Sequence, residues 1–196
     1  MKRANLIILL LALAILGLAG ALLWHGEHGR TAPPASDIGG PFHLIADTGA
    51  PVDQAVLNGK WSAVYFGYTF CPDVCPTTLA ALAQAQAALG AKARDFQVVF
   101  ITVDPARDTP AQLRAYLSSP SFPKGSIGLT GSAAQIKAVA SAYHVYYRRR
   151  GNGPDYSMDH TSIVYLMDPE GRFVRPLTPG PPTDMARQIL AAMASE

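Results

Sequence analysis

The only two cysteines of the chain, Cys71 and Cys75, lie between an apolar run and a helical run. The apolar, β-rich run covers residues 63–68, and the run rich in Ala, Leu and Gln covers residues 77–89. Both thiols are therefore expected in a strand-to-helix turn, where backbone N–H groups and the helix dipole favour thiolate over thiol. The C-x-x-x-C spacing lets the two sulfur atoms meet in one small volume, where they can form a disulfide or bind a soft metal ion.

The elements around this turn alternate between strand and helix. We expect strands at residues 61–66, 96–103, 162–167 and 173–175, helices at residues 77–89, 110–117, 133–143 and 183–193, and an entry hairpin at residues 40–60. A βαβ half is thus followed by a ββα half, with the cysteines at the end of the first core strand. This order predicts an α/β fold of the thioredoxin-like kind with three layers.

The N-terminus carries a targeting signal. Lys2 and Arg3 precede an uncharged apolar run from Leu6 to Trp24, close to the roughly 20 residues that a helix needs to cross a bilayer core. We expect residues 1–24 to form a single-pass transmembrane anchor, residues 25–40 a flexible linker and residues 41–196 one thioredoxin-like domain. The alternative is a cleaved signal peptide, since residues 19–21 form a small-residue cleavage site.

The charge pattern bears on location and partners. The positive-inside rule places the domain on the outer side of the cytoplasmic membrane, in an oxidising compartment such as the periplasm. The formal net charge is only +2, and the longest basic run is residues 148–150. A nucleic acid partner is therefore not expected.

Three uses of the cysteine pair are open: a structural disulfide, a redox-active pair and a metal site. A bridge between Cys71 and Cys75 closes too short a loop to stabilise the fold much, which argues against the first use. The spacing is one residue longer than the C-x-x-C of dithiol oxidoreductases, and it lies within the range of cysteine metal ligands.

His160 is the expected third ligand. It directly precedes the strand at residues 162–167, and in a thioredoxin-like topology that turn lies across from the cysteine turn. Two thiolates and one imidazole suit Cu(I) in a three-coordinate site and accept Cu(II) when an oxygen completes it, while zinc tolerates the same donors. Asp159 is expected either to orient the imidazole or to be solvated. Asp73, between the cysteines, either attracts a cation or is a solvated turn residue.

A charged loop follows the second core strand. Asp104, Arg107 and Asp108 lie at the end of the strand at residues 96–103, and this edge of an open α/β sheet often binds ligands. The loop is therefore expected to contact a partner. The alternative is an Arg/Asp pair that braces the loop.

Three motifs in order are similar to those of the Sco (SenC) family of copper proteins: Tyr68–Leu79 (YTFCPDVCPTTL), Val103–Pro110 (VDPARDTP), and Asp159–Thr161 followed by Tyr165–Gly171. The resemblance covers residues 41–193. It implies a membrane-anchored thioredoxin-like domain in which Cys71, Cys75 and His160 bind copper, as Cu(I) and also as Cu(II), with zinc less favoured.

The resemblance also implies a function. The domain would receive copper from an upstream donor and deliver it to the binuclear copper centre of cytochrome c oxidase subunit two, or prepare the thiols of that centre. The alternative is an extracytoplasmic thiol-disulfide oxidoreductase that uses Cys71 and Cys75. Whether the chain is an enzyme stays open at this point.

Overall fold

The computed structural model describes residues 37–178 and 181–195. The anchor expected at residues 1–24 and most of the expected linker lie outside these residues. Among the helices of the described part, none combines the length and the apolar character needed to span a bilayer.

The secondary structure follows the expected alternation. In chain order the elements are β1 (His43–Ala46), β2 (Pro51–Asp53), the 3-10 helix η1 (Gln54–Leu57), β3 (Trp61–Gly67), α2 (Val74–Ala88), the 3-10 helix η2 (Gly90–Asp95), β4 (Phe96–Thr102), α3 (Pro110–Leu117), β5 (Ile127–Thr130), α4 (Ala133–Ala142), β6 (Tyr147–Arg150), β7 (Ser157–His160), β8 (Val164–Met167), β9 (Phe173–Leu177) and α5 (Pro182–Met193).

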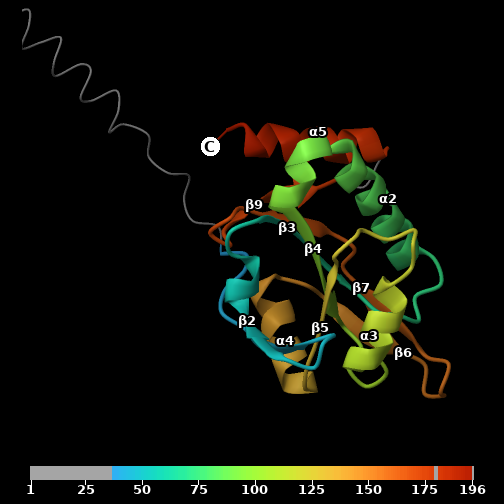
Figure 1. The fold of residues 1–196 in the computed structure, drawn as a ribbon. Helices are drawn as coiled ribbons and strands as arrows, with labels where there is room; N and C mark the ends of the chain where they lie inside the picture. Colours follow the sequence, from blue (N-terminus) through green and yellow to red (C-terminus); the bar gives the residue numbers. More distant parts are fainter. Residues whose placement is uncertain (1–36, 179–180, 196) are drawn as a thin grey trace, which may run out of the picture. The chain divides into compact units, whose positions relative to one another are not determined.

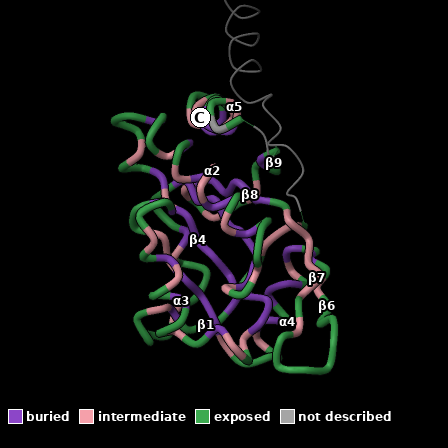
Figure 2. Tube along the Cα trace, turned by 90° about the vertical axis from the view of Figure 1, so that its right-hand side faces the viewer, coloured by how far each residue is buried: buried purple, intermediate pink, exposed green. Residues whose placement is uncertain are grey.

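A seven-stranded sheet with the order β2-β1-β5-β4-β3-β8-β9 forms the centre of the domain (Figure 1). β3, β4 and β5 run parallel, and β8 runs antiparallel to β3. All seven residues of β3 are buried, as expected for a strand covered on both faces. Figure 2 shows the same pattern, with buried residues along β4 and β8 and exposed residues in the outer loops.

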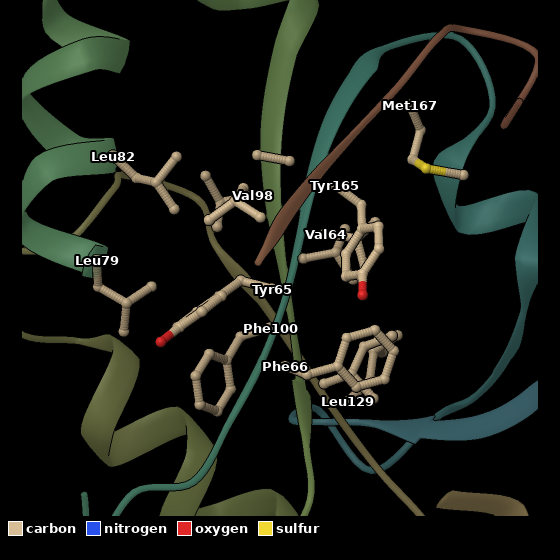
Figure 3. Close-up of a cluster of buried hydrophobic side chains, with 14 of the residues drawn as sticks. Val64, Tyr65, Phe66, Leu79, Leu82, Val98, Phe100, Leu129, Tyr165 and Met167 are labelled. Carbon is tan, nitrogen blue, oxygen red and sulfur yellow. The ribbon is translucent and has the colours of Figure 1, made fainter. Parts of the chain in front are cut away.

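Helices cover both faces of this sheet, which gives the expected three layers. The ring of Phe100 in β4 lies 5.9 Å from that of Tyr116 in α3, on one face. Phe66 in β3 lies 5.3 Å from Tyr143, which caps the C-terminus of α4, on the other face. Figure 3 shows Tyr65 on the side of Leu79 and Leu82 of α2, and Phe66 and Tyr165 on the opposite side. The predicted α/β thioredoxin-like architecture is therefore confirmed.

Local signals explain where the helices begin. Thr109 accepts a hydrogen bond from the Gln112 N–H at the start of α3, and Pro110 occupies the first turn. Ser132 and Gln135 form a capping box at the start of α4. α2 begins at Val74 instead of the expected Thr77, because Pro76 falls in the first turn, where a missing N–H costs no helical hydrogen bond. Cys75 is therefore a helical residue.

The largest departure from the expected pattern lies between α4 and β8. β6 and β7 form a separate two-stranded antiparallel sheet, joined by residues 151–156. No strand was expected at residues 157–160, and His160 was expected in a turn. His160 is instead the last residue of β7, paired with Tyr147 of β6.

Candidate metal centre

Sheet topology brings three distant segments to one edge. β3 and β4 are parallel neighbours, so the loops that follow them lie side by side. β8 is antiparallel to β3 and therefore begins at the same edge. Cys71 lies in the loop after β3, Cys75 in the first turn of α2, and His160 immediately before the segment that leads into β8.

The structure brings all three sequence-predicted site residues together. The two Sγ atoms and a ring nitrogen of His160 lie within 4.8 Å of one another. Cys75 Sγ is 3.5 Å from His160 Nε2, and the Cys75 N–H donates to Cys71 Sγ at 3.4 Å. Both cysteines are free thiols in the structure.

The imidazole of His160 is oriented by a backbone group. Its Nδ1 atom lies 3.0 Å from the carbonyl oxygen of Thr161. A carbonyl can only accept, so Nδ1 carries the proton and Nε2 presents its lone pair toward Cys75. The rings of Tyr68 and Tyr65 lie 5.9 Å and 6.4 Å from the imidazole, both edge to face. The arrangement fixes the tautomer that metal ligation through Nε2 requires.

Burial changes the protonation of these groups. Removal from water raises the pKa of the Cys75 thiol to about 12, so the expectation that the turn favours a thiolate is wrong for Cys75. The helix N-terminus is outweighed because the Cys75 side chain is fully buried. Burial also lowers the pKa of His160, which keeps the imidazole neutral and its lone pair available.

Access to the centre comes from the side of Cys71 and His160. Both residues line a pocket of about 410 Å³, together with Tyr68, Pro72 and Met158. Cys71 is partly exposed, whereas Cys75 lies beneath it and is buried. An incoming ligand therefore meets Cys71 and His160 before Cys75.

The two acidic residues beside the ligands do not orient the imidazole. Asp159 points to β6, where its carboxylate lies 2.5 Å from Arg150 and 3.7 Å from Arg148. Neighbouring residues of a strand point to opposite faces, so Asp159 and His160 diverge. Asp73 is exposed and accepts a 3.4 Å hydrogen bond from the Thr77 hydroxyl.

The charged loop after β4 braces the cysteine loop. Asp108 is fully buried and accepts hydrogen bonds from the Thr69 N–H at 3.1 Å, the Thr69 hydroxyl at 2.6 Å and the Thr102 hydroxyl at 2.6 Å. Asp104 is only 3% exposed and pairs with Arg107 at 2.5 Å. The bracing alternative is correct, and these charges do not form an exposed contact surface because their side chains are turned inward.

Several residues of the centre were missed by sequence reasoning. A Cβ on Gly67 would lie 3.0 Å from Cys75 Sγ, so the glycine makes room for the sulfur. The Tyr65 hydroxyl is buried next to the Cys75 thiol. The available signal was a glycine at the end of a mostly apolar strand, directly before the cysteine turn.

The donor set fits a soft metal ion. Metal–sulfur and metal–imidazole bonds of about 2.0–2.3 Å place donors around one ion roughly 3.5–4 Å apart, which is compatible with the observed spread of up to 4.8 Å. Thiolate and imidazole donors are those that copper and zinc accept.

Similarity to known proteins agrees with this chemistry. The SCO1/SenC family model matches residues 30–195. The chain is 46% identical over 151 residues to the mitochondrial protein SCO1 homolog 1 of Arabidopsis thaliana. This match covers 76% of this chain and 44% of that protein. The chain is also 45% identical over 147 residues to protein SenC of Rhodobacter capsulatus. That match covers 74% of this chain and 65% of SenC. The match thus spans less than two thirds of either relative.

A solved structure extends the likeness to three dimensions. Bradyrhizobium japonicum ScoI, whose structure was determined with copper bound, superposes with a TM-score of 0.72 at 43% sequence identity. The match covers 79% of this chain and 98% of that one. The family model and the curated relatives each cover most of this sequence, and the chain belongs to the SCO1/SenC family.

Proposed function

We propose that this chain binds copper through Cys71 Sγ, Cys75 Sγ and His160 Nε2 and passes it to a partner protein. The observation that carries the proposal is the convergence of these donor atoms within 4.8 Å. Two sulfurs and one imidazole are the donors that Cu(I) prefers, and they accept Cu(II) when an oxygen ligand is added. The homologous ScoI with copper bound supports the same cargo.

The residues of the site have different tasks in this function. The Thr161 carbonyl holds the proton on Nδ1, so that Nε2 is free to ligate. Cys75 is buried, which makes it the innermost donor. Its thiol loses its proton when the sulfur becomes a ligand. Cys71 is partly exposed and is the ligand that an incoming donor group can replace first.

Family membership supports the destination of the cargo. The resemblance to the Sco (SenC) family implies copper delivery to cytochrome c oxidase, and membership of the SCO1/SenC family supports assigning this chain to that process. Its acceptor is the binuclear copper centre of subunit two, and an upstream donor supplies the ion. The exposed side chains of Phe70 and Val74 flank the cysteines and give an acceptor an apolar surface beside the ligands.

The location of the domain is part of the proposal. Residues 1–24 anchor the chain in the cytoplasmic membrane, and the domain at residues 41–196 works outside the cytoplasm. The support is the Lys2–Arg3 pair before the apolar run. A reporter enzyme that is active only outside the cytoplasm, fused after Glu196, is expected to be active. Activity of a cytoplasm-specific reporter at the same position would contradict this topology.

A second function is favoured by the closeness of the two thiols. In thiol-disulfide exchange, Cys71 thiolate attacks a substrate disulfide, forms a mixed disulfide and releases one substrate thiolate. Cys75 thiolate then attacks Cys71 Sγ and releases the second. The pair ends oxidised to a disulfide and the substrate ends as two thiols. This reaction needs both cysteines and no imidazole.

Copper binding by matched variants separates the two functions. The reduced chain is loaded with Cu(I) without oxygen, and the bound copper is measured against a competing chelator. Cys71→Ser, Cys75→Ser and His160→Ala are expected to lose at least about 10-fold in affinity. His43→Ala, which alters an exposed histidine on β1, is expected to bind as the wild type does.

The same variants are assayed for disulfide exchange. His160→Ala is expected to retain most of the exchange activity of the Cys71–Cys75 pair while it loses copper. A wild-type chain that reduces disulfides but retains no copper would overturn the copper-delivery proposal and leave the oxidoreductase.

A further inference from the structure

One arginine side chain touches both segments that carry the ligands. The guanidinium carbon of Arg107 lies 4.5 Å from the ring centroid of Phe70 and 3.6 Å from that of Tyr156. Phe70 is the residue before Cys71, and Tyr156 is the residue before β7, which ends in His160. The Arg107 side chain is only 15% exposed, although the Phe70 ring that it contacts is 56% exposed.

Hydrogen bonds to Asp104 link Arg107 and Tyr156 as well. Asp104 accepts from Arg107 Nε at 2.5 Å and from the Tyr156 hydroxyl at 2.6 Å. The second face of the Tyr156 ring is covered by Arg149 of β6, whose guanidinium carbon lies 3.8 Å from the centroid. We call the group of Asp104, Arg107 and Tyr156 the clasp. It connects the loop after β4 to the hairpin that bears His160.

Besides the clasp, the hairpin packs against the core through Tyr147 and Met158. β6 and β7 pair only with each other in the described part of the chain, outside the central sheet, and a lone two-stranded hairpin is marginally stable. Residues 151–155 are exposed. A pocket of about 400 Å³, lined by Asp104, Tyr147, Tyr156 and Met158 among others, lies beside the clasp.

We propose that the clasp positions His160 against the cysteine pair. Tyr156 and Arg107 are positioning residues: they touch no donor atom, and they act by setting where β7 lies relative to the cysteine loop. This proposal rests on the proposed copper site for the identity of the metal. Its geometric part, the placement of β7 by Tyr156, applies to the metal-free chain as well.

The test uses a matched pair of tyrosine variants. Tyr156→Phe keeps the ring and removes the hydroxyl that donates to Asp104. Tyr146→Phe makes the same change at a 58% exposed residue beside the same hairpin. Tyr156→Phe is expected to lower Cu(I) affinity about 10-fold and to speed amide hydrogen exchange of residues 157–160 in the metal-free chain, whereas Tyr146→Phe is expected to do neither.

A double-mutant cycle distinguishes positioning from general loosening. If Tyr156 acts through the imidazole, Tyr156→Phe has no further effect on copper affinity in a His160→Ala background. Equal losses in both backgrounds, an equal loss in Tyr146→Phe, or unchanged copper affinity in Tyr156→Phe would overturn the proposal. Arg107→Gln, which removes the stacking charge, provides a second variant with the same expected pattern.

Failure of the copper site itself would look different. If His160→Ala bound copper as the wild type does, the imidazole would not be a ligand and the proposed function would fail. Amide exchange in the metal-free Tyr156→Phe chain would still test whether the clasp sets the position of β7. Faster exchange at residues 157–160 supports that role, and unchanged exchange contradicts it.

Discussion

His160 Nε2 lies 3.5 Å from Cys75 Sγ, although 85 positions separate the two residues in sequence. One side chain comes from the end of β7 and the other from the first turn of α2. Because the Thr161 carbonyl holds the Nδ1 proton, the Nε2 lone pair faces the thiol. The donor atoms of the proposed copper site are thus already close together in the chain without metal.

The two cysteines are expected to differ in reactivity. Cys75 is fully buried, and burial raises the pKa of its thiol to about 12, so little thiolate is available at neutral pH. In the reduced, metal-free chain, iodoacetamide should modify Cys71 first. Peptide mass spectrometry over time checks this order, and equal rates for the two thiols would contradict the burial of Cys75.

Gly67→Ala should disturb the centre directly. The added Cβ would lie 3.0 Å from Cys75 Sγ and 2.8 Å from a ring carbon of Phe100. We expect a loss of about 1–3 kcal/mol in the free energy of unfolding, together with weaker copper binding. Urea unfolding and chelator competition measure the two effects. In Gly153→Ala, whose Cβ meets nothing within 4 Å, both should stay near the wild type, and an equal loss there would refute the steric argument.

Asp108→Asn should loosen the cysteine loop. The Asp108 carboxylate accepts three hydrogen bonds, two of them from Thr69, and an amide would turn its own donor group toward these donors. We expect the chain to lose about 1–3 kcal/mol of stability and the Thr69 amide to exchange faster with solvent. Asp155→Asn, at an exposed position, is the control. Slow Thr69 exchange in Asp108→Asn would argue against the brace.

The stability of the metal-free chain should depend on pH through His160. Burial lowers the pKa of this imidazole in the folded chain, whereas the unfolded chain takes up the proton near pH ~6.5. Between the two pKa values the unfolded state binds more protons, so this stabilising contribution is complete above about pH 6.5 and is lost as the pH falls through the folded-state pKa.

Urea unfolding at several pH values tests this dependence. The stability of the wild type should fall more steeply than that of His160→Gln when the pH is lowered below about 6.5. Parallel curves for the two chains would show that His160 does not remain neutral in the folded state.

Much of the fold was accessible from the sequence because its signals are local. The continuous apolar runs of β3 and β4 predict buried central strands, and Pro110 and Ser132 mark helix starts. The start of α2 was expected at Thr77 but lies at Val74, since Pro76 in the first turn costs no helical hydrogen bond. β7 was missed because its sequence, SMDH, has no apolar alternation and depends on pairing with β6.

The convergence of Cys71, Cys75 and His160 was also predicted, but the surroundings of these residues were not. Spacing and element order suffice to bring Cys71, Cys75 and His160 together. The protonation of Cys75 depends on the burial of its side chain between the first turn of α2 and β3, which no local pattern reveals. The direction of Asp159 depends on which face of β7 it occupies, and the inward turn of Asp104 and Asp108 depends on partners far away in the sequence, such as Tyr156 and Thr69.

The donors of bound copper can be counted directly. X-ray absorption at the copper edge of the Cu(I)-loaded chain should reveal two sulfur neighbours at about 2.3 Å and one nitrogen neighbour at about 2.0 Å. In His160→Ala the nitrogen neighbour should disappear while both sulfurs remain. A wild-type spectrum without the nitrogen, or a His160→Ala spectrum identical to that of the wild type, would contradict the site formed by Cys71, Cys75 and His160.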